Sequence, residues 1–310
     1  MIIIKKISVI IPTRNRPGKI ENCLKSLFAQ TIPPNEIIVI DSSSSLKSSI
    51  VIKKLNKNIG IPIKFFYKKN YGSVRARNLG ARLAQSGYLA FLDDDCIAPK
   101  DWLSQIFYSI HRFPNSVIYG GNIRLSTGNY YALAEDIRIQ SGQKIYSNFD
   151  SKNFVLPKKI IKGNKLYFDT QFDNFSACED TDFGIQLIKK GIKIVYFPKI
   201  AINHYGVNSF MKLIRREFEK ARARFYLNLK YKNINDIKKW KFGSIKYFLE
   251  HKSTYTLNLI QFYVVLFLLI CCSITYRSGI LFEKFYFMIS SLKKTDSNVF
   301  ANSSAPSSVG

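Results

Sequence analysis

The chain has 310 residues, of which 46% are hydrophobic and 22% are charged. This composition excludes an intrinsically disordered protein and supplies enough apolar surface for one large domain, with or without an appended region. The 47 Lys and Arg against 21 Asp and Glu give a formal charge of +26, which indicates a polyanionic partner such as nucleic acid, anionic lipid or a nucleotide. A compositional bias of the source genome is an alternative origin of the lysine excess.

The cysteine pattern and the N-terminus both indicate a reducing compartment. The five cysteines form no CxxC pair and no Cys/His spacing typical of a zinc site. The chain begins MIIIKKISVIIP, and its first apolar run is too short for the apolar region of a signal peptide. We therefore expect the main domain of the protein to lie in the cytosol.

Apolar runs alternate with amphipathic segments in the first part of the chain. Strands are expected at residues 7–11, 37–40, 63–67 and 88–92, and helices at residues 18–30, 45–58 and 72–84. This alternation is typical of a mostly parallel sheet that helices cover on both faces. The sequence contains neither the GxGxxG dinucleotide fingerprint after the first strand nor a GxxxxGK[ST] phosphate loop.

The fourth expected strand ends abruptly at three acids, Asp93, Asp94 and Asp95. Ligands of open parallel sheets bind outside the carboxyl ends of the strands. Because side chains alternate along an extended segment, we expect Asp93 and Asp95 to face one way and Asp94 the other. That arrangement suits a divalent cation that carries phosphates. The alternative is an exposed turn whose carboxylates accept backbone hydrogen bonds.

Other polar residues flank the expected strands, and each has an ordinary structural explanation. Arg77 and Asn78 lie on the helix before the fourth strand, where a solvated helix face is the usual reason for such residues. Asp41 ends the second strand and can simply cap the turn that follows.

A second acidic cluster begins a helix in the later part of the chain. Glu179, Asp180 and Asp182 fall in its first turn, where acids commonly do no more than interact with the helix dipole. A strand is expected at residues 192–197, and His204 follows it. A lone histidine is more often a hydrogen-bonded structural residue than a metal ligand.

The combined spacing of these features resembles the family 2 glycosyltransferases. The first matching pattern is Asn70, Gly72, Ala76-Arg77-Asn78, Gly80 and Leu92-Asp93-Asp94-Asp95. The second is a Phe-Asp before a loop, then Glu179-Asp180, then an apolar helix that ends in glycine. The resemblance covers residues 6–206 and implies an α/β fold of the GT-A type, with a mostly parallel sheet sandwiched by helices. It also implies a nucleotide-diphosphate sugar donor, Mn²⁺ or Mg²⁺ as the cofactor, and inversion at the anomeric carbon.

The resemblance assigns roles to individual residues. It implies that Asp95 and His204 hold the metal. It also implies that Asp180 takes the proton of the acceptor, with Glu179 as the alternative base. The donor is implied to be bound by Pro12, Thr13, Arg14, Asp41, Arg77, Asn78, Asp93 and Asp94.

Two departures from the family pattern and one uninformative segment concern specificity. Serines follow Asp41 where a second acid is common, and Ala177-Cys178 replaces the glycines often found before the acidic pair. A strand at residues 117–125 is interrupted by Gly120-Gly121, which would allow a ligand to approach the backbone closely. Residues 126–166 show little periodicity, and the resemblance places acceptor specificity in this part of the chain.

A basic tail is expected after a catalytic domain of residues 1–208. Residues 212–246 carry twelve Lys or Arg and three acids, net +9, with apolar residues at helical spacing. Such a helix suits an anionic membrane, although a core helix with a solvated outer face is an alternative. Residues 254–275 are predominantly apolar and near the ~20 residues that span a bilayer; a membrane hairpin or a buried dimer helix are alternatives. Residues 209–294 are thus expected to associate with a membrane, and residues 295–310 to be disordered.

These features predict an inverting glycosyltransferase of bacterial cell-surface polysaccharide or glycolipid synthesis, located at the cytoplasmic face of the cell membrane. Its partners would be the donor, a carbohydrate or lipid-linked acceptor, and the anionic membrane surface.

The main alternative to this function is a nucleic-acid-binding protein, suggested by the charge of +26. None of the usual nucleic-acid-binding modules is recognisable in the sequence, and the acids at the strand ends would repel a polyanion. A catalytically silent membrane-assembly partner is the third alternative, and the completeness of the motifs argues against it.

Overall fold

The structure, a computed structural model, describes residues 6–55, 60–124, 129–141, 149–175, 177–231, 243–251, 253, 255 and 257–302. The strands within these ranges are β1 (Ile7–Thr13), β2 (Glu36–Asp41), β3 (Ile63–Tyr67), β4 (Tyr88–Leu92), β5 (Cys96–Ile97), β6 (Val117–Tyr119), β7 (Asn122–Arg124), β8 (Asn153–Pro157), β9 (Ile194–Tyr196) and β10 (Ile202–His204). The helices are α1 (Pro17–Phe28), α2 (Lys47–Leu55), α3 (Ser73–Leu83), α4 (Trp102–Arg112), α5 (Tyr130–Ser141), α6 (Lys158–Asn164), the 3-10 helix η2 (Thr170–Asn174), α7 (Glu179–Lys189), α8 (Phe210–Lys230), α9 (Gly243–Glu250) and α10 (Leu259–Asn302).

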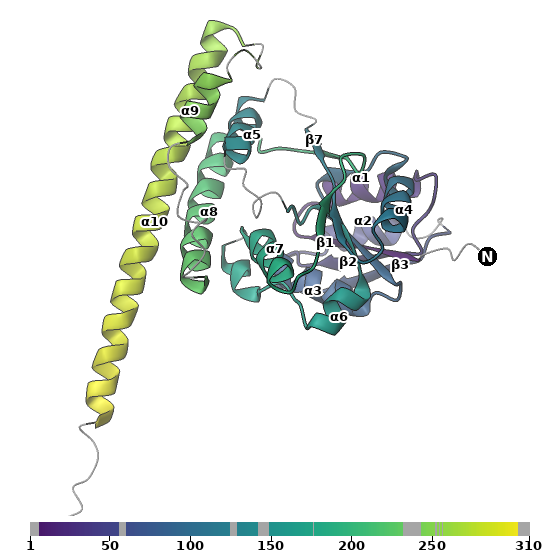
Figure 1. The fold of residues 1–310 in the computed structure, drawn as a ribbon, viewed down its shortest axis with the longest axis horizontal. Coiled ribbons are helices and arrows are strands. Elements are labelled where there is room, and N and C mark those ends of the chain that lie inside the picture. The colour runs from purple at the N-terminus through teal and green to yellow at the C-terminus, as the bar shows by residue number, and fades with distance from the viewer. Residues whose placement is uncertain are drawn as a thin grey trace, which may run out of the picture.

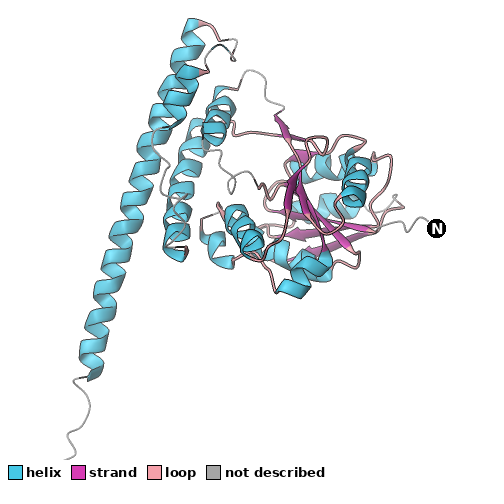
Figure 2. Cartoon of the chain, viewed as in Figure 1, coloured by secondary structure: helices cyan, strands magenta, loops and turns pink. Residues whose placement is uncertain are grey.

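A seven-stranded sheet forms the centre of the first part of the chain, with the strand order β3-β2-β1-β4-β8-β6-β9. Strands β3, β2, β1 and β4 are parallel neighbours, whereas β8 runs antiparallel to both β4 and β6. A second sheet of three strands has the order β5-β10-β7. Helices lie on both sides of the large sheet (Figure 1 and Figure 2), so the predicted α/β fold with a mostly parallel sheet is confirmed.

The alternation of side chains along β1 divides the core into two layers. Ile7, Val9 and Ile11 pack in the cluster that α1, α2 and α4 cover, and Ile10 packs in the cluster that α3, α6 and α7 cover. All four side chains are fully buried. Because both faces of the sheet are covered, its strands are continuous apolar runs, and polar residues concentrate where the strands end.

The strand expected over residues 117–125 is two short strands that belong to different sheets. Gly120 and Gly121 separate β6 from β7. A Cβ atom on Gly120 would lie 1.6 Å from the carbonyl oxygen of Ile200. The expectation that a ligand approaches the backbone at Gly120 is therefore wrong, because the protein's own backbone fills that space.

The C-terminal helices pack against α5 as a bundle. Arg138 of α5 donates from Nε to Glu217 of α8 at 2.6 Å, and from Nη1 to Ser244 of α9 and Ser273 of α10 at 3.3 Å each. Arg138 and Glu217 are both buried. One buried arginine thus connects side chains of four helices, and such a network specifies how the helices pack.

Helix α10 differs from two expected boundaries. Residues 295–302 belong to α10, whereas disorder was predicted from residue 295, and residues 303–310 lie outside the described residues. The apolar run that begins near residue 254 enters α10 at Leu259. The region 209–294 therefore contains three helices within its described parts, where one amphipathic helix and one apolar segment were expected.

Gly279 of α10 lies directly against α8, so a substitution there tests the packing of the two helices. A Cβ atom there would be 2.8 Å from the Cβ of Ala221 and 2.9 Å from the carbonyl oxygen of Phe218. We expect Gly279→Ala to lower the free energy of unfolding by about 1–3 kcal/mol, although alanine favours helix. Differential scanning calorimetry on the purified chain measures this change.

Gly163→Ala in α6 is the matched control for this prediction. The added Cβ would have no atom within 4 Å, so this variant should be neutral or more stable by up to about 1 kcal/mol. A Gly279→Ala protein that is as stable as Gly163→Ala would contradict the close packing of α8 and α10.

Candidate active site

The three acids after β4 lie on a tight turn. The amide that follows the third acid donates to the carbonyl oxygen of Asp93 at 3.1 Å. Asp94 and Asp95 consequently share a contact with Arg16, whereas Asp93 contacts Arg77. The expected alternation, with Asp93 and Asp95 on one side, is wrong because the backbone turns directly after the strand.

Asp94 joins the end of β1 to the start of α1. Its carboxylate accepts a hydrogen bond from Thr13 Oγ1 at 2.7 Å and from Arg16 Nη1 at 2.9 Å. The side chain is buried. Burial and the neighbouring charge of Asp95 raise the pKa of Asp94, whereas the Arg16 cation lowers it. The net result is a pKa of about 6. Thr13, predicted to bind the donor, is therefore placed directly beside the acids.

Asp95 faces the end of β10. Its Oδ1 atom lies 3.3 Å from Nε2 of His204, and its Oδ2 atom lies 3.1 Å from Arg16 and 3.5 Å from Lys19. Burial opposes ionisation, but His204 and the two cations hold the pKa of Asp95 well below its usual range. The structure thus brings the two predicted metal ligands, Asp95 and His204, into contact across strands β5 and β10.

The donor atoms at this point fit a divalent cation. Asp95, Cys96 and His204 each offer one ligand atom, and these atoms lie within 4.8 Å of one another. His204 Nε2 is buried and has no hydrogen-bond partner among the described residues. Burial raises the pKa of the Cys96 thiol well above its usual value, so the thiol stays protonated. Because a thiolate and not a protonated thiol binds a metal, Asp95 and His204 remain as the candidate ligands, and the carboxylate oxygen of Asp95 suits Mn²⁺ or Mg²⁺.

Arg77 joins the two acidic clusters. Its Nη2 atom contacts Asp93 Oδ1 at 2.7 Å, and its Nη1 atom contacts Glu179 Oε1 at 3.1 Å. The guanidinium lies over the ring of Phe168 and only 4% of the side chain is exposed. Although burial opposes the charge, Asp93 and Glu179 raise the pKa of Arg77. The solvated face that is the usual explanation for such a residue is therefore excluded for Arg77.

The acidic pair begins α7, next to a residue with unusual backbone geometry. Cys178, which precedes Glu179, has φ of 65°, in the left-handed region where glycine is favoured. This explains why glycine suits this position in the family pattern.

Asp180 accepts a hydrogen bond from the amide of Thr181 at 2.7 Å. Removal from bulk water and the neighbouring charges of Glu179 and Asp150 raise the pKa of Asp180 to about 7.

A lysine and an acid from the segment directly before β8 also act on Asp180. Lys152 Nζ contacts Asp150 Oδ2 at 2.7 Å. The charge of Lys152 lowers the pKa of Asp180, whereas the charge of Asp150 raises it. A carboxylate with a pKa near 7 is suited to accept and release a proton at neutral pH.

Four other predicted donor residues have different surroundings. Asp41 is buried and accepts from the amide of Ser43 at 2.9 Å and from Ser49 Oγ at 3.2 Å, as a capping residue does. Asn78 donates to and accepts from the backbone of Phe168, at 2.8 and 2.9 Å. Arg14 is exposed. Pro12 is buried in β1. The structure thus does not bring the side chains of Asp41 and Asn78 into the acidic cluster.

Sequence reasoning missed several residues of the cluster. Arg16 and Lys19 lie just after Thr13 and contact the acids, and their proximity to β1 in the sequence could have indicated this. Lys152 belongs to the segment without a readable motif. Asp173 accepts from the first amides of α3, including that of Val74 at 2.8 Å, and so fixes the helix that carries Arg77.

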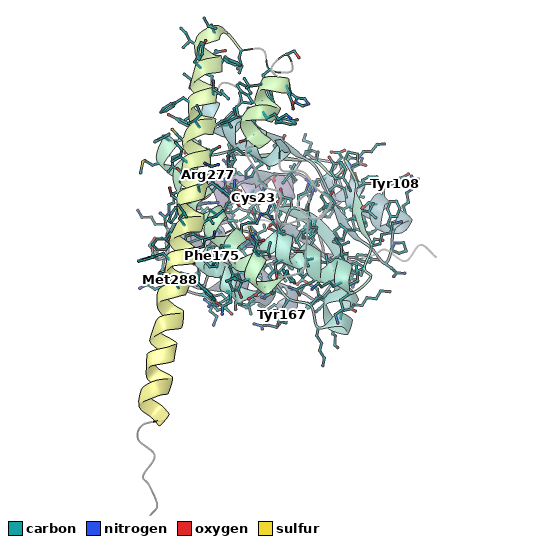
Figure 3. The ribbon with its side chains drawn as sticks, turned by 60° about the vertical axis from the view of Figure 1, so that its left-hand side comes forward. Cys23, Tyr108, Tyr167, Phe175, Arg277 and Met288 are labelled. Carbon is teal, nitrogen blue, oxygen red and sulfur yellow. The ribbon has the colours of Figure 1, made fainter. Side chains whose placement is uncertain are left out.

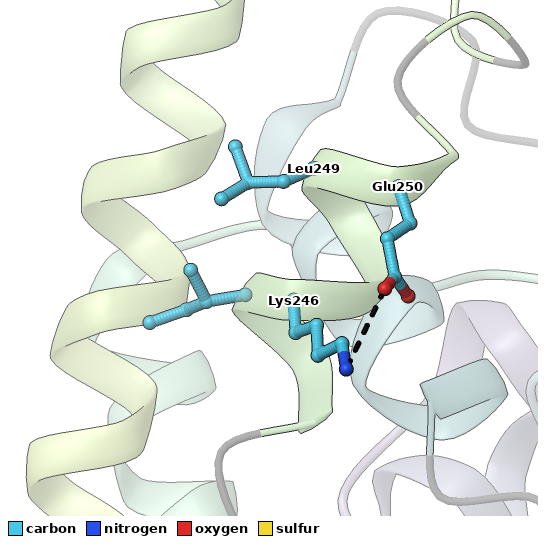
Figure 4. Close-up of a pocket in the computed structure, with 4 residues that line it drawn as sticks. Lys246, Leu249 and Glu250 are labelled. Atoms are coloured by element: carbon cyan, nitrogen blue, oxygen red, sulfur yellow. Dashed lines mark ion pairs between the residues drawn. The ribbon is translucent and has the colours of Figure 1, made fainter.

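A pocket on α9 lies outside this cluster of site residues. It is lined by Ile245, Lys246, Leu249 and Glu250, with Lys246 and Glu250 paired at 3.7 Å (Figure 4). None of the predicted site residues lines it. We therefore assign it no chemical role.

Comparison with known proteins identifies the family of this chain. A sequence model described as "Glycosyl transferase family 2" matches residues 8–174, just over half of the chain. A dolichyl N-acetyl-alpha-D-glucosaminyl phosphate 3-beta-D-2,3-diacetamido-2,3-dideoxy-beta-D-glucuronosyltransferase of Methanococcus voltae is 27% identical over 70% of this chain and 72% of its own length. A GalNAc(5)-diNAcBac-PP-undecaprenol beta-1,3-glucosyltransferase of Campylobacter jejuni is 30% identical over 54% of this chain and 57% of its own length.

A solved structure shares the fold. The mannosyltransferase PcManGT of Pyrobaculum calidifontis, in complex with GDP-Man and Mn²⁺, superposes with a TM-score of 0.62 over 90% of this chain and 88% of its own, at 13% identity. This identity establishes a shared GT-A fold and no more. On the match of the family model and the agreement of the fold, this chain belongs to glycosyl transferase family 2.

Proposed function

We propose that this protein transfers a sugar from a nucleotide-diphosphate sugar to a hydroxyl group of a carbohydrate or lipid-linked acceptor, with inversion at the anomeric carbon. The observation that carries the proposal is the bridge of Arg77 between Asp93 and Glu179. It places the acids of the β4 turn beside the acidic pair of α7, so that donor and acceptor groups can meet in one site.

Asp180 is the residue to which we assign the base. As the acceptor oxygen attacks the anomeric carbon, its proton passes to the Asp180 carboxylate, and the bond from carbon to the leaving diphosphate breaks. One displacement from the opposite face accounts for inversion. The pKa of about 7 supports this role, because the carboxylate is then a stronger base than an ordinary aspartate. Glu179 forms an ion pair with Arg77, so we favour Asp180 over Glu179 as the base.

The donor side is assigned to the turn after β4 and the end of β1. Asp95 and His204 would hold Mn²⁺ or Mg²⁺, which when bound neutralises charge on the leaving diphosphate. Two observations support this choice. His204 Nε2 is buried 3.3 Å from Asp95 without a well-aligned hydrogen bond, and the structure of the mannosyltransferase contains Mn²⁺. Asp93 would lie nearer the ribose, and Thr13, with Pro12 and Arg14, nearer the base.

The location and acceptor are proposed from the relatives and from α10. The names of the M. voltae and C. jejuni enzymes specify dolichyl phosphate and undecaprenol diphosphate carriers. Helix α10 contains one segment, Leu259–Met288, that is long and apolar enough to cross a membrane by length and composition. We propose that the protein works at the cytosolic face of the cell membrane in the synthesis of a surface glycan or glycolipid.

The base assignment predicts the effect of Asp180→Asn. The amide keeps the size of the side chain but accepts no proton, so kcat should fall about 10²-fold or more while the affinity for donor stays nearly unchanged. The assay follows metal-dependent turnover of a panel of UDP-sugars and GDP-sugars. If Glu179→Gln is inactive and Asp180→Asn is active, the base is assigned one residue too late.

A stability measurement separates this loss from unfolding. Because the folded protein raises the pKa of Asp180 from 3.8 to about 7, ionisation of Asp180 destabilises the fold as the pH rises through this window. Asp180→Asn should therefore have a higher Tm than the unsubstituted chain at pH 8, and this difference should disappear below pH 4. A lower Tm at pH 8 would contradict the raised pKa.

The pair Lys152 and Asp150 predicts opposite changes in the pH profile. The unsubstituted enzyme should lose kcat/KM as the pH falls below about 7, because Asp180 becomes protonated. Lys152→Met removes a charge that lowers the pKa of Asp180 and should move this limb to higher pH. Asp150→Asn removes a charge that raises it and should move the limb to lower pH. Limbs that move in the same direction would contradict the assignment.

The metal assignment predicts that Asp95→Ala abolishes the Mn²⁺-dependent part of nucleotide binding. Titration calorimetry with UDP or GDP, with and without Mn²⁺, measures it, and the Tm shows that the protein remains folded. Asp101→Ala, which removes an exposed acid at the start of α4, is the control and should bind as the unsubstituted chain does. Equal metal dependence in both variants would exclude Asp95 as a ligand.

A further inference from the structure

The outer face of α10 carries large exposed apolar side chains between Ile260 and Phe285, interrupted by the exposed residues Arg277 and Ser278. Ile260, Phe267, Ile270, Ile274, Leu281 and Phe285 recur at spacings of three, four or seven residues and expose between 42% and 76% of their surface. We call these six residues the apolar stripe. In Figure 3 α10 lies across the front of the molecule, where Arg277 and Met288 are labelled on it. A surface of this kind on a soluble protein marks an interaction site.

The opposite face of α10 packs on the rest of the bundle along the same length. Phe262 stacks on Phe248 of α9 with ring centroids 5.1 Å apart. Further along, Ser273 accepts from Arg138, and Gly279 lies against α8. Near the end of this length, Glu283 accepts from Arg222 of α8 at 2.5 Å. Neighbouring helices thus accompany α10 from Phe262 to Glu283.

This packing is incompatible with a helix that crosses a bilayer. Any stretch of about 20 residues within Leu259–Met288 contains residues that contact α5 or α8. If that stretch stood in hydrocarbon, the adjacent turns of α8 would enter with it, and these carry Arg215, Arg216, Glu219, Lys220 and Arg222. Charged side chains in the centre of a bilayer are strongly disfavoured. Only the outer face of α10 can therefore meet lipid.

The charge of the bundle fits an anionic lipid surface. Helix α8 has seven Lys or Arg and two Glu, so its net charge is +5. Exposed cations lie on three helices of the bundle, at Lys212, Arg215, Lys246 and Lys284. An amphipathic helix with apolar side chains on one face and cations beside them lies in the plane of the bilayer interface, where the long cationic side chains reach the phosphates.

We propose that α10 lies flat in one leaflet of an anionic membrane through the apolar stripe, and that it does not span the bilayer. The proposal deepens the membrane location given above and rests on it. It commits to lipid as the occupant of the apolar stripe, because a second copy of a chain with a charge of +26 would bring like charges of α8 and α10 together. The catalytic domain and the whole of α10 would then lie on the cytosolic side.

Labelling the two ends of the apolar segment tests this orientation. Asn258→Cys and Ser291→Cys flank the segment Leu259–Met288 in the full-length chain. Sealed membrane vesicles, prepared with the cytosolic face outward or inward, are treated with a membrane-impermeant maleimide, and the unsubstituted chain gives the background of the five native cysteines. We expect both variants to react only in vesicles with the cytosolic face outward. Reaction of the two variants from opposite sides would show a spanning helix and overturn the proposal.

Vesicle flotation of the purified chain tests the occupant. Ile274→Glu combined with Leu281→Glu should reduce binding to vesicles that contain phosphatidylglycerol by at least tenfold, whereas Ile50→Glu, an equally exposed apolar site on α2, should leave it unchanged. Equal binding by both variants, or a dimer that the double substitution converts to a monomer, would overturn the proposal. Turnover of the donor is measured in parallel, so failure of the membrane orientation is distinguished from failure of the proposed transferase activity.

Discussion

The site depends on one buried arginine. Arg77 is the residue through which the acid of the β4 turn, Asp93, and the first acid of α7, Glu179, are held together. Two carboxylates brought this close without a cation would repel each other and lose hydration, whereas a guanidinium between them satisfies both. The helix that carries Arg77 is itself fixed at its first turn by Asp173. The donor side and the acceptor side are therefore parts of one electrostatic unit.

The C-terminal bundle connects to the same unit through α8. Lys230 contacts Asp182 at 2.6 Å and Asp169 at 2.7 Å, and Tyr231 donates to Asp182 at 2.8 Å. Asp182 is fully buried and lies in the first turn of α7, two residues after Asp180. An ion pair and a hydrogen bond thus join α8, which packs against α10, to α7, which carries the proposed base. A membrane surface bound by α10 would sit at a fixed position relative to the catalytic acids.

Local patterns in the sequence were sufficient for the parallel sheet, whereas the roles of the site residues were predicted from the resemblance to the family. Apolar runs that end in polar residues predicted β1 to β4, and the acids after β4 are in the cluster, whereas Asp41 at the end of β2 is not. The turn after β4 was not predictable, because an Asp triplet is compatible with both an extended segment and a turn. The contact of Arg77 with Glu179 joins residues 102 positions apart, which no periodicity encodes. Lys152 was missed because its segment has no repeating pattern, and the bonds of Asn78 to the backbone of Phe168 could not be predicted from the sequence.

The central claim is that Arg77 couples Asp93 to Glu179, and a double-mutant cycle on unfolding tests it without knowledge of the substrate. The free energy of unfolding is measured for Asp93→Asn, Glu179→Gln and the double variant, both with Arg77 and with Arg77→Met. The account predicts a coupling energy of about 0.5–3 kcal/mol when Arg77 is present, and additivity to within about 0.5 kcal/mol when it is replaced. Additive effects with Arg77 in place would contradict it.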